Sequence, residues 1–222
     1  MGFEWDFTYV LKFQSMLWLG LLGTLKVGLV SLCFGAMIGL ALALMRLSRY
    51  RTLSIPATAV IEFFRTTPLL IQLFWVYFAL PIVIGVKFDA YTAAVITLSV
   101  QSGSFFAEVF RAGILSIDKS QWDGGRALGM TPRQLMQRIV LPQAVRRMIP
   151  PFLERAFELM KGTTQVATIS YGELLYNAMT LTAQLYRPLE IYTLVAIMYL
   201  VMLTAASFGI RMLERRLQRA YG

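Results

Sequence analysis

Histidine is absent from this sequence of 222 residues, and cysteine occurs only once, at Cys33. The absence of histidine excludes metal sites and acid–base catalysis that depend on an imidazole ring. A single cysteine cannot form a disulfide within the chain. Because Cys33 lies inside an apolar run, we predict that it is a small residue of the hydrophobic core.

Three short motifs are also missing. No G-x-x-x-x-G-K-[ST] pattern occurs, so we expect that this chain does not hydrolyse ATP and is not an enzyme. The N-terminal stretch MGFEWDFTYVLKFQ is acidic, and the apolar run after it is too long for a signal peptide and lacks an A-x-A site. Asp6 occupies the Ser/Thr position of a myristoylation motif. We therefore predict neither a cleaved signal peptide nor a myristoyl anchor.

Acidic residues are scarce: 12 Asp and Glu stand against 21 Lys and Arg, for a net charge of +9. The chain is 57% hydrophobic, with a mean hydropathy of +0.62, more apolar surface than a soluble protein of this size buries. In a soluble protein the positive charge would suggest nucleic acid. Here the basic residues flank apolar runs, which indicates membrane topology. We expect contact with membrane lipid and none with nucleic acid.

Apolar runs of the length needed to cross a bilayer, about 20 residues, occupy residues 17–45, 55–80, 88–110 and 190–210. A fifth segment, 148–168, is more charged but otherwise apolar. We predict an all-α, polytopic membrane protein with five transmembrane helices in a single domain, residues 1–222. Residues 111–147 would form a cytoplasmic loop.

The basic residues also predict the orientation. With the N-terminus outside, fourteen of the 21 Lys and Arg residues fall on inner segments and three on outer ones. Inner segments of membrane proteins are enriched in Lys and Arg, so the N-terminus is predicted outside and the C-terminus inside. Without the helix at 148–168, Arg211–Arg219 would lie opposite the other basic clusters, so the bias supports that helix too. Gly35 and Gly39 form a G-x-x-x-G step, which predicts close helix packing.

The segment DGGRALGMTPRQLMQRIVLP, residues 123–142, is a polar and basic insertion between apolar runs. We predict two short helices in it. Asp118 or Ser120 would cap the first helix, and Gly129 would end it in the left-handed conformation. Thr131 and Pro132 would begin the second helix, which Leu141-Pro142 would end.

Three large apolar residues of this loop, Trp122, Leu128 and Met130, have no membrane to cover them. A helix–glycine–helix knob with apolar residues predicts a contact surface for a partner protein. Alternatively, the loop only sets the topology or meets anionic lipid.

The spacing of Asp123-Gly124-Gly125, Gly129 and Ile139-x-Leu141-Pro142 resembles the cytoplasmic loop by which permease subunits of bacterial ABC importers dock on their ATPase. The run from Glu62 to Gln72, EFFRTTPLLIQ, is similar to the second-span signature of permeases for polar amino acids. Lys161-Gly162-Thr163-Thr164, followed by Glu173-Leu174, resembles their fourth-span region. The resemblance covers residues from about 17 to 212, and it is to permeases of the histidine, glutamine, arginine and glutamate uptake type.

This resemblance implies a homo- or heterodimer with a sister permease in the bacterial inner membrane. Two ATPase subunits would lie inside and a periplasmic or extracellular solute-binding protein outside. This chain would bind no cofactor, since ATP and Mg²⁺ belong to the partner ATPase. The residues implied in ATPase coupling are Asp123, Gly124, Gly125, Ala127, Leu128, Gly129 and Met130.

The sequence departs from the family pattern in three places. Asp-Gly-Gly stands where Glu-Ala-Ala is typical, and each glycine lowers helix propensity by ~1 kcal/mol. We therefore expect the first helix of the loop to fray or to begin later. Thr66 stands where glycine is common and Gly162 where aspartate is common, which suggests a specificity different from that of well-known members.

Charged residues inside the predicted spans are costly and are often functional. Arg65 lies near the membrane midplane by helix rise, three residues after Glu62. This pair either fixes a helix or lets Arg65 contact a substrate carboxylate. Glu154, Glu158 and Lys161 follow an i, i+4, i+7 stripe that would face the bundle interior or the dimer seam. Glu108 would pair with Arg111, three residues later.

The residues predicted to line a substrate pathway are Glu62, Arg65, Thr66, Gln72, Glu158, Lys161 and Thr163. We expect Gly162 to Thr164 to loosen the helix, which would free backbone groups for a ligand. The alternative for Glu158 and Lys161 is a purely structural polar seam. At the level of function, the alternatives are an ion-coupled secondary amino acid transporter and a scaffold that transports nothing. The sequence does not identify the substrate.

Overall fold

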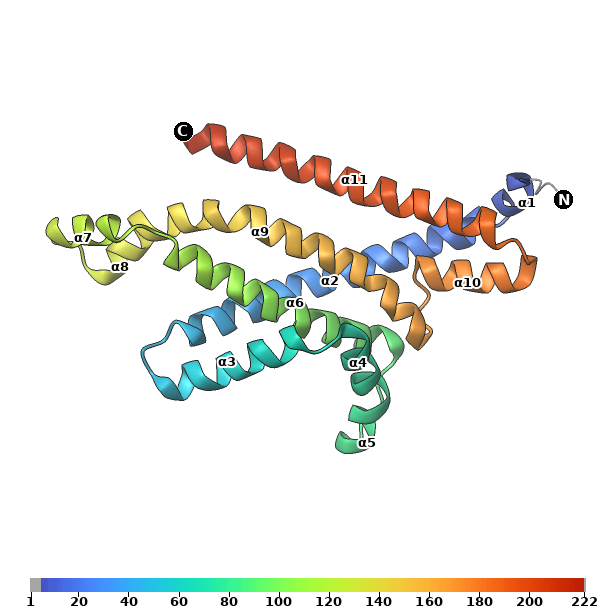
Figure 1. The fold of residues 1–222 in the computed structure, drawn as a ribbon, viewed down its shortest axis with the longest axis horizontal. Coiled ribbons are helices and arrows are strands. Elements are labelled where there is room, and N and C mark those ends of the chain that lie inside the picture. Colours follow the sequence, from blue (N-terminus) through green and yellow to red (C-terminus); the bar gives the residue numbers. More distant parts are fainter. Residues whose placement is uncertain (1–4, 222) are drawn as a thin grey trace. The chain divides into compact units, whose positions relative to one another are not determined.

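The computed structural model describes residues 5–221, and the side chains of residues 5–208 except Tyr9 and Leu11. The described part of the chain is helical and contains no strand (Figure 1), which confirms the predicted all-α class. Segments η1 and η2 are π-helical, and η3 is a 3₁₀ helix. In chain order the elements are α1 (Phe7–Leu11), α2 (Gln14–Arg46), α3 (Arg51–Thr66), α4 (Leu69–Phe74), η1 (Trp75–Ala79), α5 (Leu80–Ile84), α6 (Ala90–Leu115), α7 (Lys119–Ala127), α8 (Pro132–Leu135), η2 (Met136–Val140), α9 (Leu141–Gly162), η3 (Thr163–Ile169), α10 (Leu174–Leu185) and α11 (Pro188–Tyr221).

Among the described residues, three helices are long and apolar enough to cross a membrane: α2, α6 and the Pro188–Phe208 part of α11. Helix α3 and the segment Leu69–Ile84 make a fourth span if this bent pair is taken as one. Helix α9 does not meet the same criteria, because it carries four charged residues between positions 154 and 161. The total of five spans and the orientation of the chain therefore stay predictions.

The predicted span at 55–80 is not one continuous helix. Helix α3 ends at Thr66, and Thr67 is extended with φ −86° and ψ 137°. Pro68 follows Thr67, and the residue before a proline is displaced from the helical region by the proline ring. The chain is helical again from Leu69. The α-helix ends at Gly162 as predicted, but the chain continues as the 3₁₀ segment Thr163–Ile169, so the backbone tightens there and does not loosen.

The chain divides into two compact units. The first unit comprises residues 1–30, 69–98 and 159–222, and the second comprises residues 31–68 and 99–158. The first has two apolar clusters, one around Leu73, Leu98 and Val166 and one around Leu174, Leu181 and Ile191. The second has a cluster around Leu135 and Val140 and a smaller one around Ile61.

In the first unit, the fully buried carboxylate of Glu173 joins three helices. Its Oε1 accepts a hydrogen bond from the Tyr176 amide at 2.7 Å, which caps the start of α10. Its Oε2 accepts hydrogen bonds from the hydroxyls of Thr24 in α2, at 3.3 Å, and Tyr199 in α11, at 2.7 Å. Burial raises the pKa of the Glu173 carboxyl above its usual range, although these hydrogen bonds favour the charged form.

In the second unit, Gly35 and Gly39 bring α2 against α6. A Cβ atom on Gly39 would lie 2.7 Å from Cβ of Phe106 and 2.8 Å from the carbonyl oxygen of Gly103. The predicted G-x-x-x-G packing surface is therefore confirmed.

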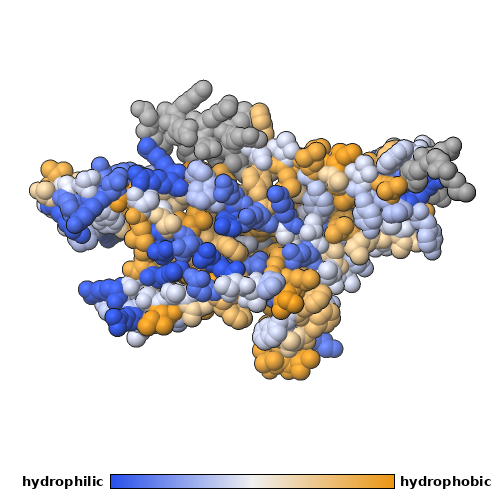
Figure 2. Space-filling model, in the orientation of Figure 1, coloured by the Kyte–Doolittle hydropathy of each residue, from blue (hydrophilic) through white to orange (hydrophobic). Residues whose placement is uncertain are grey.

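Cys33 is exposed, so its assignment to the core was wrong. Phe34 and Met37 of the same helix are also exposed. An apolar side chain on the outer surface is stable when the surrounding solvent is lipid. Figure 2 shows the same feature over α5, where apolar side chains cover the surface; Ile82 and Val83 there are 83% and 73% exposed.

Candidate functional site

The predicted coupling loop forms a compact helical hairpin of α7 and α8 at the start of α9 (Figure 1). Helix α7 begins at Lys119 and runs through Gly124 and Gly125 to Ala127, so the prediction of a frayed or late first helix was wrong. Gly125 is buried, and a Cβ atom on it would overlap the side chain of Leu135. The absence of a side chain at Gly125 therefore permits a close approach that offsets its low helix propensity.

The turn between the two helices follows the prediction. Gly129 has φ +72°, in the left-handed region, and the Met130 amide donates to the Gly125 carbonyl. Thr131 caps α8 in a capping box with Gln134. Asp118 precedes α7 but its side chain does not cap the helix. It pairs instead with Arg147 at 3.4 Å.

Leu141-Pro142 does not end the second helix, contrary to the prediction. The π-helical segment η2 leads from α8 into α9, and the Leu141 amide donates to the carbonyl of Met136, five residues earlier. A π turn places one extra residue in the helix. The proline then follows the widened turn, where its missing amide hydrogen is tolerated without a break.

Exposure separates the residues that were predicted to dock. Leu128 is 77% exposed at the tip of the hairpin. Trp122 and Met130, which were predicted to be contact residues too, are half-buried against the apolar cluster that contains Ile117 and Leu135. Among the other predicted coupling residues, Gly125 is buried. The remaining ones are exposed: Asp123, Gly124, Ala127 and Gly129.

A network of ion pairs connects α2, α3 and α6 within the second unit. Glu108 pairs with Arg111, as predicted, and with Arg46 at 2.6 Å. Arg65 lies 3.6 Å from Glu62, which confirms that these two residues share a face. Arg46 also lies 3.7 Å from Glu62. This role of Arg46 could not be predicted from local sequence, because its partners Glu62 and Glu108 lie on other helices.

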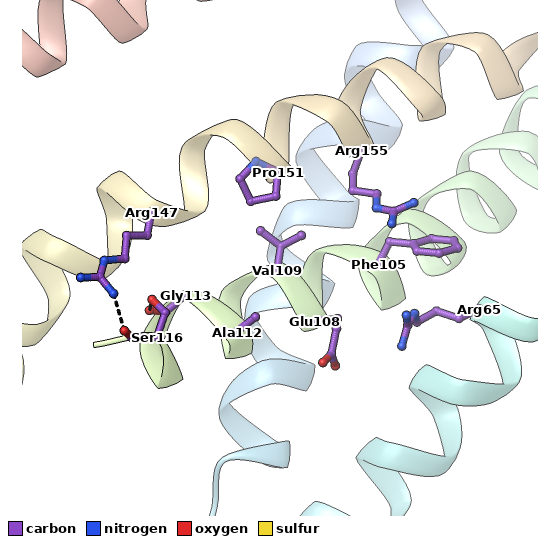
Figure 3. Close-up of a pocket in the computed structure, with 10 residues that line it drawn as sticks. All are labelled: Arg65, Phe105, Glu108, Val109, Ala112, Gly113, Ser116, Arg147, Pro151 and Arg155. Atoms are coloured by element: carbon purple, nitrogen blue, oxygen red, sulfur yellow. Dashed lines mark hydrogen bonds between the residues drawn. The ribbon is translucent and has the colours of Figure 1, made fainter. Parts of the chain in front are cut away.

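A cavity of about 330 Å³ adjoins this network (Figure 3). Arg65 and Arg155 both approach the ring of Phe105, with guanidinium carbons 5.7 and 4.8 Å from the ring centroid. Arg147 is turned toward the Ser116 carbonyl, to which it donates a hydrogen bond. The residues that line the cavity are Arg65, Phe105, Glu108, Val109, Ala112, Gly113, Ser116, Arg147, Pro151 and Arg155.

The predicted pathway residues are distributed over both units. Glu62, Arg65, Thr66 and Glu158 belong to the second unit, and Gln72, Lys161 and Thr163 belong to the first. Gln72 and Thr163 are buried, and the Thr163 hydroxyl donates to the Met160 carbonyl at 2.8 Å. The Thr66 hydroxyl donates to the Glu62 carbonyl at 2.8 Å.

The predicted polar stripe does not face the interior of the chain. Glu154, Glu158 and Lys161 are all exposed. Glu158 pairs with Arg155 at 2.6 Å. The stripe was predicted to face either the bundle interior or the seam of a dimer, and the dimer seam stays a prediction.

The chain matches known transport proteins over most of its length. The family model described as binding-protein-dependent transport system inner membrane component matches residues 35–219. The probable glutamine ABC transporter permease protein GlnM of Bacillus subtilis is 34% identical, over 93% of this chain and 95% of that protein. The glutamine transport system permease protein GlnP of Escherichia coli is 35% identical, over 88% and 90%.

A solved structure described as an amino acid ABC transporter with histidines is similar in fold, with a TM-score of 0.91. It is 32% identical in sequence, and the match covers 96% of this chain and all of that one. With a helical fold, a matching family model and relatives of this identity, the chain belongs to the family of binding-protein-dependent transport system inner membrane components, the permeases of ABC importers.

Proposed function

We propose that this chain is the permease subunit of an inner-membrane ABC importer for a polar amino acid or related zwitterion. The names of its relatives make glutamine the first substrate to test. The chain would form half of the translocation pathway, with a sister permease as the other half. A solute-binding protein would deliver the substrate from outside.

The observation that carries the coupling role is the α7–α8 hairpin. Its tip presents Leu128, 77% exposed, on a hairpin that is held together by the Gly125–Leu135 packing. An exposed leucine on a packed knob fits a groove on a partner protein. The partner would be the ATPase that holds ATP and Mg²⁺.

Coupling is tested with Leu128→Asp in the full complex in membranes. A charge at the centre of a desolvated contact removes a main anchor of the interface, so ATPase recovered with the permease should fall by about tenfold or more. Leu128→Met keeps the apolar contact. Gln137→Asp adds the same charge at an exposed position of η2. Both control variants should retain the ATPase.

Full recovery of the ATPase with Leu128→Asp would refute the docking role. Uptake by this chain alone, driven by an ion gradient without an ATPase, would establish the ion-coupled secondary transporter instead.

We further propose that Glu62, Arg65, Thr66, Gln72, Glu158, Lys161 and Thr163 line the substrate pathway. Glu158 and Lys161 are exposed, so Glu158→Gln and Lys161→Gln should leave the fold intact while uptake slows. Uptake kinetics and assembly are measured on the same preparations. Unchanged kinetics in both variants would reject the pathway role of these two residues.

A further inference from the structure

The cavity in the second unit is lined by three cations, Arg65, Arg147 and Arg155, and by one carboxylate, that of Glu108 (Figure 3). Figure 2 shows hydrophilic side chains gathered on the face between α3 and α9. The carboxylate of Glu108 already pairs with two arginines that do not line the cavity, Arg46 and Arg111. The cavity therefore has an excess of positive charge.

Arg65 has donors that the described side chains do not satisfy. Its Nη1 lies 3.6 Å from Glu62, beyond hydrogen-bonding distance. Its Nε is buried and has no acceptor among the described residues. A buried guanidinium donor without an acceptor costs free energy that a bound oxyanion would recover.

Arg155, in α9, supplies a second guanidinium to the cavity, and the Phe105 ring lies between it and Arg65 of α3 (Figure 3). Its Nη1 donates to Glu158 at 2.6 Å, which uses one of its five N–H donors. Phe105 contacts both guanidiniums, so two like charges lie against one apolar ring. An anion near both of them would relieve their repulsion.

Arg147 differs from these two, although it lines the same cavity. It donates to the Ser116 carbonyl, and its Nη2 lies 3.4 Å from Asp118, the residue before α7. These contacts direct it toward the hairpin and away from Arg65 and Arg155 (Figure 3). They also show that the cavity adjoins the α7–α8 hairpin, so it lies on the side of the chain where the ATPase would dock.

We propose that Arg65 and Arg155, placed against Phe105, form a carboxylate site that takes the α-carboxylate of the amino acid as it leaves toward the ATPase side. The inference rests on the proposed function for the identity of the ligand. Guanidinium is a planar fork that matches the two oxygens of a carboxylate. The volume of about 330 Å³ lies within the range of small-molecule sites.

The test uses the complete importer, without its solute-binding protein and without nucleotide, in nanodiscs of neutral lipid. Acetate, glutamine and glutaminamide, which lacks the carboxylate, are titrated by calorimetry. Acetate and glutamine should bind saturably, and glutaminamide should not. Arg65→Gln and Arg155→Gln should each weaken binding about tenfold, while Arg147→Gln, which removes a more distant charge of the same cavity, should weaken it clearly less.

Arg65→Lys keeps the positive charge but loses the planar guanidinium group. Its loss of acetate affinity should therefore be smaller than that of Arg65→Gln. A loss in Arg147→Gln equal to that in Arg65→Gln would overturn the site, because it would show a general effect of positive charge. Binding of phosphate or anionic lipid in place of acetate would overturn it as well, and would assign the cavity to lipid headgroups.

Different results would overturn the carboxylate site and the proposed importer function. Normal ATP-driven glutamine uptake with no acetate binding overturns this site and leaves the proposed function standing. Acetate binding that depends on Arg65 and Arg155, without any amino acid uptake by the intact importer, supports the anion site and overturns the proposed function.

Discussion

Two carboxylates in this chain are held in opposite ways. Glu173, in the first unit, is fully buried and accepts hydrogen bonds only from neutral donors, the hydroxyls of Thr24 and Tyr199 and the Tyr176 amide. Glu108, in the second unit, is partly exposed and pairs with Arg46 and Arg111. Neutral donors fix a junction between helices but leave the carboxyl easy to protonate. Paired cations keep the charge and draw neighbouring guanidiniums into one region.

The difference indicates that the Glu173 junction stabilises the fold, whereas the region around Glu108 is suited to bind a ligand. The Glu173 junction ties α10 to α2 and α11 with bonds that leave no donor over for a ligand. The region around Glu108 holds more guanidinium donors than carboxylate acceptors, and Arg65 keeps a buried Nε without an acceptor among the described residues. Buried, satisfied polar groups stabilise a fold, whereas unsatisfied ones are suited to bind something else.

The largest effect is expected from Glu173→Ala. This change leaves the Tyr199 hydroxyl and the Tyr176 amide without their acceptor and removes one of the two acceptors of the Thr24 hydroxyl. The expected cost is about 3 kcal/mol in the free energy of unfolding. Thermal unfolding of the purified protein in detergent measures it. Glu154→Ala, at an exposed position, is the control. Equal unfolding midpoints for the two variants would contradict the role of the Glu173 junction.

The pH dependence of stability tests the same carboxyl without removing its side chain. Its pKa is raised in the folded protein, mainly by burial, so the folded state binds the proton more tightly than the unfolded state. The contribution of this group to the free energy of unfolding is complete at a pH below the glutamate pKa in the unfolded chain. It is lost as the pH rises through the higher pKa of Glu173 in the folded protein. Glu173→Gln removes the titration. Its unfolding midpoint, measured from pH 4 upward, should decline less than that of the wild type; parallel curves would show that Glu173 does not titrate there.

Glu108→Gln tests the other carboxylate. It removes the charge that pairs with Arg46 and Arg111, but all three side chains are partly exposed, so solvent screens much of the loss. A decrease of about 1 kcal/mol in unfolding free energy is expected. At a higher salt concentration, the difference in unfolding free energy between Glu108→Gln and the wild type should become smaller, because salt screens the ion pairs. A loss as large as that of Glu173→Ala would remove the contrast between the two sites.

The smallest effect on stability belongs to the exposed pair of Arg155 and Glu158. The Glu158 side chain is 61% exposed, and exposed ion pairs contribute about 0.5 kcal/mol or less. Glu158→Gln should therefore leave the unfolding midpoint close to that of the wild type. A shift comparable to that of Glu108→Gln would place Glu158 in a structural seam instead of a pathway.

Local chemistry in the sequence predicted the hairpin better than it predicted the longer helices. Gly129 and Thr131 act through their immediate neighbours, so the turn and the cap follow from the sequence. The helical Gly125 is explained by its close approach to Leu135 and Ile139, ten and fourteen residues away, whose positions depend on the fold.

Prolines and isolated carboxylates were harder to interpret. Pro68 follows the end of a helix, whereas Pro142 follows a π turn within a continuous helical stretch, and Pro150 and Pro151 lie inside α9 without ending it. Glu173 was noted only as part of a family resemblance, and its partners Thr24 and Tyr199 are distant in the sequence. Its place directly before a helical run, where an acidic side chain can cap, was a signal that could have indicated its role.

The π turn at Met136–Val140 has a mechanical consequence. From Pro132 to Gly162 the backbone stays helical without a loop, so a force on the hairpin reaches α9 directly and is not absorbed by a flexible connection. The π turn contains one residue more than an α-helical turn, so its conversion into regular α-helix would rotate the helix beyond it by about 100°. Such a rotation would re-orient Arg147 and Arg155, which lie in α9 beyond the π turn, relative to the hairpin.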